Sequence, residues 1–485
     1  MRFLRKLSLK AAASKKSSGQ ITVFLALCFL VFLSLYLVCL QSVQKQHQRK
    51  QAEQAVEAGM FSLFSEYEPH LLDRYDLFYL DTSFGGGSER QEELCSHLWQ
   101  FTKNNLTDGL GNYLQGLSLQ GVNVNQLVRA TDGRGAVFYR QAVQVMKEKT
   151  GADLAEDWLL QELFAEDGEE NSRRFREDCE AYEGSVRDYE EEEEDEEDGE
   201  SRRMDPEARQ WDGLWQGFSL AAAVPDGYVV SERAVDLGSA PSVRELSVGA
   251  GIPQGGEQNL LTKQWFVSYL CEYLTQAQES MKEPREQGYL DYQLEYLIAG
   301  KDSDSENLDA VLTRLLLLRE GANYLFLLSH PELRQKAEAL AVLLAGMTGN
   351  GGLIKSLEQL ILLGWAYGES LAEVRQLLGG YELSAVKTVA DWQVPLSGLM
   401  AFLGDPGRYD VPIKVQKGIS YETCLRIFLM TESWETLALR AMDVTEGELR
   451  QLEGCRNLHL DHCVERLTAQ IWIEDLYLER SYGYE

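Results

Sequence analysis

The chain has 485 residues, of which 44% are hydrophobic and 25% charged, and its formal net charge at pH 7 is −31. A chain of this length buries one large core or two ordinary ones, which excludes a single small module. The strongly acidic balance argues against nucleic acid as a partner.

The first feature in chain order is an uncharged apolar stretch over residues 21–40, bounded by Ile21 and Leu40. At about 1.5 Å per helical residue it spans a hydrocarbon core of roughly 30 Å, so it predicts a transmembrane helix. Residues 1–20 form a leader that contains Lys and Arg but no Asp or Glu. The positive-inside rule therefore predicts a single-pass protein of the cell membrane, with the N-terminus cytoplasmic and the bulk of the chain extracytoplasmic.

Three fates are open to this segment. A cleaved secretory signal is disfavoured, because the apolar run exceeds the usual ~7–15-residue signal core and no small-x-small site follows it. Gly19 and Gln20 directly precede the apolar run, as in prepilin-type precursors, and processing after Gly19 is therefore one alternative. An uncleaved signal anchor is the preferred interpretation.

Residues 41–165 are predicted as a stalk helix followed by a first α/β segment. No proline occurs before Pro69, so the membrane helix is expected to continue. Ala52, Ala55, Val56 and Met60 recur at three- and four-residue steps and predict a stripe that packs on the globular part. Further expected elements are strands over 75–81 and 117–130, a turn at 131–135, and helices over 89–106, 136–149 and 153–164.

Composition changes abruptly after this segment. Residues 166–210 are predicted as an acidic disordered linker, because a dense run of like charges such as 189–200 repels itself into an open coil. A weak calcium trap is the functional alternative, although ordered calcium sites need ligands at set offsets. Residues 211–258 are rich in Gly, Ser and Pro and predict an irregular segment with short strands such as 228–230.

Leucines at helical spacing predict a large helical domain over residues 259–463. Its expected helices are 264–282, 289–298, 307–328, 331–345, 353–366, 371–378, 421–430, 434–442 and 445–452. Residues 464–485 are predicted as a C-terminal strand and tail, the strand itself covering 462–474. The predicted fold class is α+β, mainly α, with a small antiparallel sheet joining the N- and C-terminal segments and the helical domain inserted between them.

Charged residues on otherwise apolar helices are the candidate site residues. They are Glu295, Arg319, Glu369, Arg426, Arg440 and Asp443. A buried charge has to be paired, so structural ion pairs explain these residues at least as well as catalysis does.

Two other groups carry residues that could bind a metal. Cys455, His459, His462 and Cys463 carry zinc-type ligands, but Gly454 and Asn457 break the helix that would align them, so an ordinary strand entry is expected. Residues 302, 304 and 306 have EF-hand-like spacing without the glycine and the final glutamate, and Ser303, Asp304 or Ser305 is expected to cap a helix instead. No metal and no cofactor are therefore expected.

Several short blocks carry a family resemblance: GQITVFL from residue 19, FSEY from 64, YDLF from 75, EYLIAGK from 295, LLLREGAN from 316, WAYGES from 365 and RAMD from 440. They resemble a family of membrane-anchored bacterial proteins of unknown function, found mainly in Gram-positive anaerobes beside tight-adherence-type pilus genes. The N-terminus is similar to pseudopilin-like TadE and TadG proteins. It departs from true pilins at Phe24, where these usually carry a glutamate, so the resemblance implies an anchor more than a filament subunit.

The expected function is structural: a pseudopilin-like accessory component of a tight-adherence-type pilus or secretion system. Its expected partners are the membrane and other proteins of that system, with no nucleic acid and no small-molecule substrate. The alternative is a membrane-tethered cell-envelope hydrolase. No nucleophile elbow, phosphate loop, HExxH or dinucleotide fingerprint occurs in the sequence, so a non-enzyme is the preferred interpretation.

Overall fold

The structure is a computed structural model that describes residues 18–108, 110–150, 173–175, 177–178, 220–251, 258–345, 351–409 and 418–484. The predicted helix over 153–164 and nearly all of the predicted acidic linker lie outside the described residues. The chain forms two compact units: the first comprises Met1–Tyr67, Glu89–Leu127 and Glu465–Glu485, and the second Glu68–Ser88 and Val128–Val464. The fold is α+β, mainly α, as predicted.

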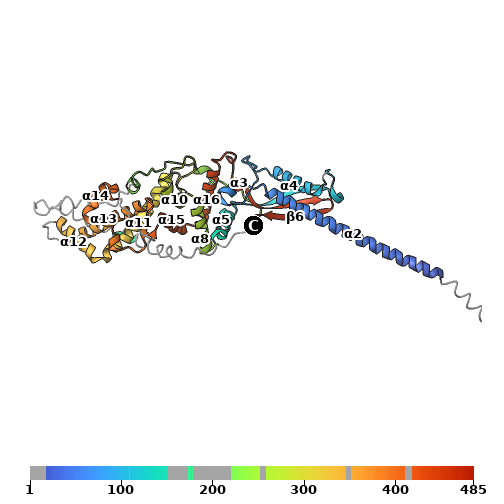
Figure 1. Ribbon diagram of the computed structural model, residues 1–485, viewed down its shortest axis with the longest axis horizontal. Coiled ribbons are helices and arrows are strands. Elements are labelled where there is room, and N and C mark those ends of the chain that lie inside the picture. The colour runs from blue at the N-terminus through green and yellow to red at the C-terminus, as the bar shows by residue number, and fades with distance from the viewer. Residues whose placement is uncertain are drawn as a thin grey trace, which may run out of the picture. The chain divides into compact units, whose positions relative to one another are not determined.

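The first unit is organised around one long helix, α2 (Ser18–Phe64), which runs through the apolar stretch and the predicted stalk without interruption (Figure 1). The predicted stripe is buried: Ala52 and Val56 are 0% exposed and Met60 is 1% exposed. Its neighbours are α4 (Gln91–Leu106) and β6 (Leu476–Gly483). Gly59 permits the close approach to α4, since a Cβ there would lie 2.5 Å from the hydroxyl oxygen of Thr102.

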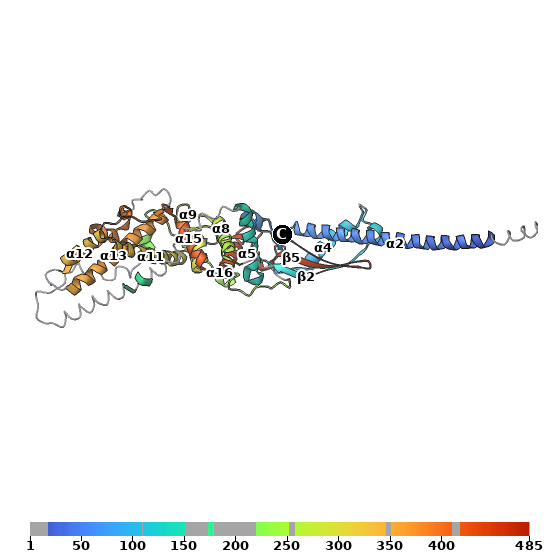
Figure 2. The same ribbon diagram turned by 90° about the horizontal axis from the view of Figure 1, so that it is seen from below.

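The strands of the first unit come from distant parts of the chain. β2 (Leu119–Arg129) hydrogen-bonds to β5 (Cys463–Ile473), and β5 pairs antiparallel with β6 (Figure 2). The predicted sheet between N- and C-terminal segments is therefore present. The predicted tail is wrong: it folds back as β6, because Glu474 adopts a left-handed conformation (φ 49°) that closes a tight hairpin.

The tail also holds the end of α2. The Phe64 ring packs against Tyr482 and Tyr484 at centroid distances of 5.2 and 4.9 Å, and the Tyr484 hydroxyl donates to the Phe64 carbonyl at 2.6 Å. This aromatic cluster fixes the packed half of α2 to the C-terminal hairpin.

The second unit begins with a short helix, and the strand predicted after it is much shorter than expected. Residues 75–81 were expected to be extended, but α3 (Pro69–Tyr75) precedes a two-residue strand, β1 (Leu80–Asp81). Pro69 occupies the first helical position and the Glu68 carboxylate accepts from the His70 N–H, which together start the helix. Asp76, at φ 53°, ends it. β1 pairs with the first two residues of β5.

The remainder of the second unit is helical. Its α-helices are α5 (Asp132–Thr150), α7 (Leu220–Ala223), α8 (Leu260–Tyr273), α9 (Ala277–Ser280), α10 (Gln293–Ala299), α11 (Asp304–Ser329), α12 (Pro331–Ala345), α13 (Gly351–Leu378), α14 (Leu399–Gly404), α15 (Tyr421–Thr431) and α16 (Trp434–Leu449). A two-stranded ladder joins β3 (Leu383–Ser384) to β4 (Gly418–Ile419). Short 3-10 helices are η1 (Leu114–Gly116) of the first unit, and η3 (Leu237–Ser239), η5 (Val389–Asp391), η6 (Leu396–Gly398), η7 (Pro406–Tyr409) and η8 (Leu460–His462) of the second.

Two predicted helix breaks are wrong. α13 is one helix where 353–366 and 371–378 were expected, and α16 runs through the expected break between 442 and 445 and ends at Leu449. Gly368 is a packing site and no break, because a Cβ there would lie 2.2 Å from Leu399 of α14. In α16 a Cβ at Gly447 would lie 2.5 Å from the Tyr289 ring. The predicted strand at 228–230 is also wrong, since these residues belong to no strand.

The predicted turn at 131–135 is confirmed: positive φ angles at Gly133, Arg134 and Gly135 precede the regular part of α5. The predicted cap is confirmed at Ser303, whose hydroxyl accepts from the Glu306 N–H at the start of α11. The Asp304 carboxylate instead accepts from the backbone N–H groups of Asp291 and Tyr292 at 3.0 Å. α11 and α12 lie beside α13, and the core of the unit forms around this group (Figure 1).

Candidate functional site

Two of the predicted site residues, Arg319 and Glu369, belong to one buried charge network on α11 and α13. Arg319 donates to both oxygens of Glu373, from Nε at 2.8 Å and from Nη2 at 3.0 Å. Lys387 Nζ lies 2.7 Å from Glu369 and 2.7 Å from Glu373. Glu369 also accepts from two backbone N–H groups of the segment after η5. Each carboxylate is thus paired as well as hydrogen-bonded.

The pKa values of the two carboxyl groups in this network are shifted in opposite directions. Burial acts to raise the pKa of Glu373, but Arg319 and Lys387 outweigh it and hold that pKa at about 2. Burial raises the pKa of Glu369 despite the nearby Lys387. A small pocket reaches the network and is lined by Glu373 and Lys387 together with polar side chains such as Gln376, Asp391 and Gln393. Since the charges already satisfy one another, the network suits a structural role.

Two predicted carboxylates lie elsewhere, on α10 and α16, with hydrogen-bond donors in place of cations. Glu295 accepts from the Ala277 N–H at 2.9 Å and the Tyr421 hydroxyl at 2.9 Å, and burial raises its pKa to about 7. Asp443 accepts from the Ser242 N–H at 2.8 Å and the Tyr296 hydroxyl at 2.7 Å. Neither is paired with an Arg or Lys within the described ranges.

The two remaining predicted residues are arginines. Arg426 pairs with Glu422 one turn earlier on α15, at 2.7 Å. Arg440 donates to the carbonyls of Leu297 and Ile298 at 2.7 and 2.9 Å, where α10 ends. The expected ion pair is not formed by Arg440 among the residues that the structure describes; its cation instead satisfies the free carbonyls of a helix C-terminus. Arg440 and Asp443 thus both contact α10, which carries Glu295, whereas Glu369 belongs to the separate network of Lys387 and Glu373.

A second charge network joins η8 to α16 and was not predicted. Arg244 donates to both oxygens of Glu446, at 2.6 and 2.9 Å, and to Asp461 at 2.6 Å. His459 Nδ1 lies 3.4 Å from Glu446. Glu446, His459 and Asp461 are close enough to hold a metal, but the guanidinium of Arg244 already occupies the carboxylates.

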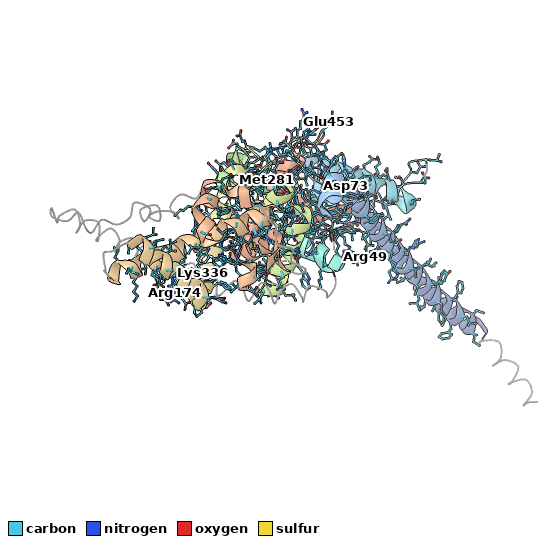
Figure 3. All side chains as sticks on the ribbon, turned by 60° about the vertical axis from the view of Figure 1, so that its left-hand side comes forward. Arg49, Asp73, Arg174, Met281, Lys336 and Glu453 are labelled. Carbon is cyan, nitrogen blue, oxygen red and sulfur yellow. The ribbon has the colours of Figure 1, made fainter. Side chains whose placement is uncertain are left out.

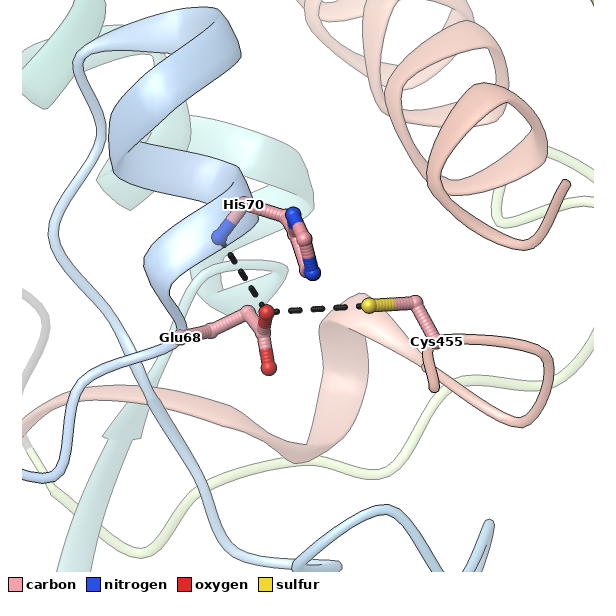
Figure 4. Close-up of side chains that lie close together, drawn as sticks. All are labelled: Glu68, His70 and Cys455. Carbon is pink, nitrogen blue, oxygen red and sulfur yellow. Dashed lines mark hydrogen bonds between the residues drawn. The ribbon is translucent and has the colours of Figure 1, made fainter. Parts of the chain in front are cut away.

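A third group differs in kind because it combines a carboxylate, an imidazole and a thiol (Figure 4). Glu68 precedes α3, His70 lies in its first turn, and Cys455 follows α16. One ligand atom from each residue lies within 4.8 Å of the other two. Glu68 Oε1 accepts from the backbone N–H of His70 at 3.2 Å and from the Cys455 thiol at 3.6 Å.

Cys455, His459, His462 and Cys463, which carry zinc-type ligands close together in the sequence, do not form one set in the structure. Cys455 contacts Glu68, His459 contacts Glu446, and the Cys463 thiol donates to the His459 carbonyl at 3.5 Å. Sequence reasoning missed Glu68 and His70 because they lie almost 390 positions before Cys455, and no local spacing links the two ends. Burial, followed by the nearby Glu68, raises the pKa of the Cys455 thiol to about 12.

Residues 195–475 match the family described as "Family of unknown function (DUF5702)". The chain belongs to this family. No curated protein and no solved structure matches it. The matched range contains Cys455 and every predicted charged site residue, while α2, Glu68 and His70 precede it. Membership in the DUF5702 family therefore identifies the helical part of the chain and assigns no chemistry to it.

The other functional element of this DUF5702 chain is α2. It is the one helix in the described part of the chain that is long and apolar enough to cross a membrane. Its apolar side chains are exposed, for example Phe29 and Phe32 at 66% and 69%. Figure 3 shows side chains projecting outward from this helix. Gly19 and Gln20 lie in the first turn of this helix. An all-round apolar surface left exposed is compatible with a single-pass anchor.

Proposed function

We propose that this protein is a structural, pseudopilin-like component of a tight-adherence-type pilus or secretion system, anchored in the cell membrane by residues 21–40. The basic leader lies in the cytoplasm and the acidic remainder makes protein contacts outside. This proposal also rests on the N-terminal resemblance to TadE and TadG proteins.

The observation that carries the proposal is the division of α2 into two halves. Its N-terminal half exposes apolar side chains on every side, whereas its C-terminal half is packed against α4 and β6. A rigid helix with this division couples a membrane segment directly to a folded exterior unit. Such coupling suits an assembly component, whose exterior part must be held at a fixed distance from the bilayer.

The charge networks support the structural proposal over the hydrolase alternative. Glu369 and Glu373 are neutralised by Lys387 and Arg319, and Glu295 and Asp443 are held by buried donors. A hydrolase needs groups that are free to exchange protons at a substrate cleft. The predicted site residues in the described ranges do not meet at such a cleft.

In-cell crosslinking of the full-length protein, followed by purification from native membranes, tests the proposal. We expect proteins of the pilus-assembly or secretion apparatus among the crosslinked species. A membrane protein of similar abundance and a single unrelated anchor serves as the control. Recovery of the same proteins by the control, or of none by this protein, would contradict the proposal.

A further inference from the structure

We propose that Glu68, His70 and Cys455 bind one Zn²⁺ ion in the second unit, with a solvent molecule as the fourth ligand. The inference is independent of the proposed function. It starts from the donor atoms: an imidazole nitrogen, a thiolate sulfur and a carboxylate oxygen are the three protein ligand types of zinc. Hard cations such as Ca²⁺ and Mg²⁺ select oxygen ligands and do not suit a site with a thiol.

The distances fit a tetrahedral ion. Zn–S and Zn–O bonds of about 2.3 and 2.0–2.2 Å at a tetrahedral angle place sulfur and oxygen about 3.6 Å apart. Glu68 Oε1 and Cys455 Sγ are 3.6 Å apart. The His70 ring leans over the gap between them (Figure 4), and the three ligand atoms lie within 4.8 Å of one another.

The charge environment separates this group from the Glu446 group. Arg244 neutralises Glu446 and Asp461, so a dication would have to displace a guanidinium there. Among the described residues, no Lys or Arg forms an ion pair with Glu68, whose carboxylate accepts only from the backbone N–H of His70 and the Cys455 thiol. When zinc replaces the thiol proton, it supplies the positive charge that this carboxylate lacks.

The position of the site allows a bound ion to hold two segments of the chain together. Cys455 is 4% exposed, while Glu68 and His70 are half-buried, so two of the three ligands are accessible to the solvent that would supply the fourth. Its ligands join the segment before α3 to the segment after α16, which are distant in the sequence. Holding such distant segments together stabilises the folded state by the free energy of metal binding.

The test uses the full-length protein in detergent, stripped with a chelator and then dialysed against Zn²⁺ alone. We expect about one zinc per chain and a higher unfolding temperature than for the stripped protein. Cys455→Ser and His70→Gln should each lose the stoichiometric zinc. His459→Gln, which alters the Glu446 group, and Cys95→Ser, which removes a thiol of the first unit, are matched controls and should retain it.

Misfolding of a variant would also abolish binding, so a second readout uses the wild-type protein. Co²⁺ in place of Zn²⁺ should give a thiolate-to-metal charge-transfer band together with the visible bands of a tetrahedral ion. Absence of stoichiometric zinc or of the charge-transfer band in the wild type would overturn the proposal. Loss of zinc in His459→Gln with retention in His70→Gln would also overturn it, because the metal would then belong to the Glu446 group.

Discussion

Arg319 on α11 and Glu373 on α13 form a bidentate ion pair in the interior of the second unit, with donor–acceptor distances of 2.8 and 3.0 Å. Arg319 is 8% exposed and Glu373 3% exposed, so neither charge is stabilised by bulk water. A buried ion pair of this kind fixes α11 relative to α13. Moving the helices apart would leave two unpaired charges in the protein interior, which costs free energy.

We expect Arg319→Ala to destabilise the protein by about 3–5 kcal/mol, since it leaves the buried Glu373 with Lys387 as its remaining cation. Arg90→Ala is the matched control. It removes an arginine whose side chain is 47% exposed and paired with the 40% exposed Glu93, and should cost at most about 1 kcal/mol. Chemical denaturation in detergent measures both. Equal losses for the two variants would contradict the structural role assigned to Arg319.

The same ion pair predicts that the protein loses stability at acidic pH. The pKa of Glu373 is lowered from 4.5 to about 2, so its stabilising contribution is fully present above pH 4.5 and is lost as the pH falls toward 2. Glu373→Gln should therefore narrow its stability deficit relative to the wild type as the pH falls through that window. A deficit that stays constant from pH 6 to pH 3 would be inconsistent with this account.

Glu320 on α11 predicts that stability changes with pH in the opposite direction. It is 3% exposed, and burial raises its pKa from 4.5 to about 8. Between these values the folded protein retains a proton that the unfolded chain has lost, so stability falls as the pH rises, by up to about 1.4 kcal/mol per pH unit.

Glu320→Gln should remove that slope, because the amide does not ionise. The free energy of unfolding of this variant is expected to rise relative to that of the wild type between pH 5 and pH 8. The same substitution at the exposed Glu332, Glu332→Gln, should leave the pH dependence as in the wild type. Unfolding free energies at several pH values measure the effect. Parallel curves for the wild type and Glu320→Gln would refute it.

Gly368→Ala tests the close packing of α13 on α14. The added Cβ would lie 2.2 Å from a Leu399 methyl, so we expect a loss of about 1–3 kcal/mol. Gly351→Ala at the start of the same helix meets nothing within 4 Å and should be neutral or slightly stabilising. Thermal unfolding compares the two. A neutral Gly368→Ala would show that α14 does not pack at this position.

Periodicity predicted those parts of the fold that depend on neighbouring residues. The stripe from Ala52 to Met60 lies on one helix face, and the alternation in residues 117–130 marks a strand, so both could be read locally. Gly368 misled the prediction, because a glycine that admits Leu399 has the same sequence signal as one that ends a helix. In residues 476–483 the alternation of apolar and polar side chains is too weak to predict β6 from the sequence.

The candidate sites were less accessible, because their partners are remote in the sequence. The charge on Arg319 predicted that a partner must exist, but Glu373 could be assigned only once α11 and α13 were packed together. Glu68, His70 and Cys455 carried no joint signal at all. Their chemistry appears only where the segments before α3 and after α16 meet in the second unit.

The most direct test of the proposed function exchanges the anchor. Residues 21–40 are replaced by an unrelated transmembrane helix, and the crosslinking experiment in native membranes is repeated beside the wild type. Because the contacts are assigned to the acidic exterior part, the account predicts that both proteins recover the same pilus-assembly or secretion proteins. Failure of the wild-type protein to recover any such protein would contradict it.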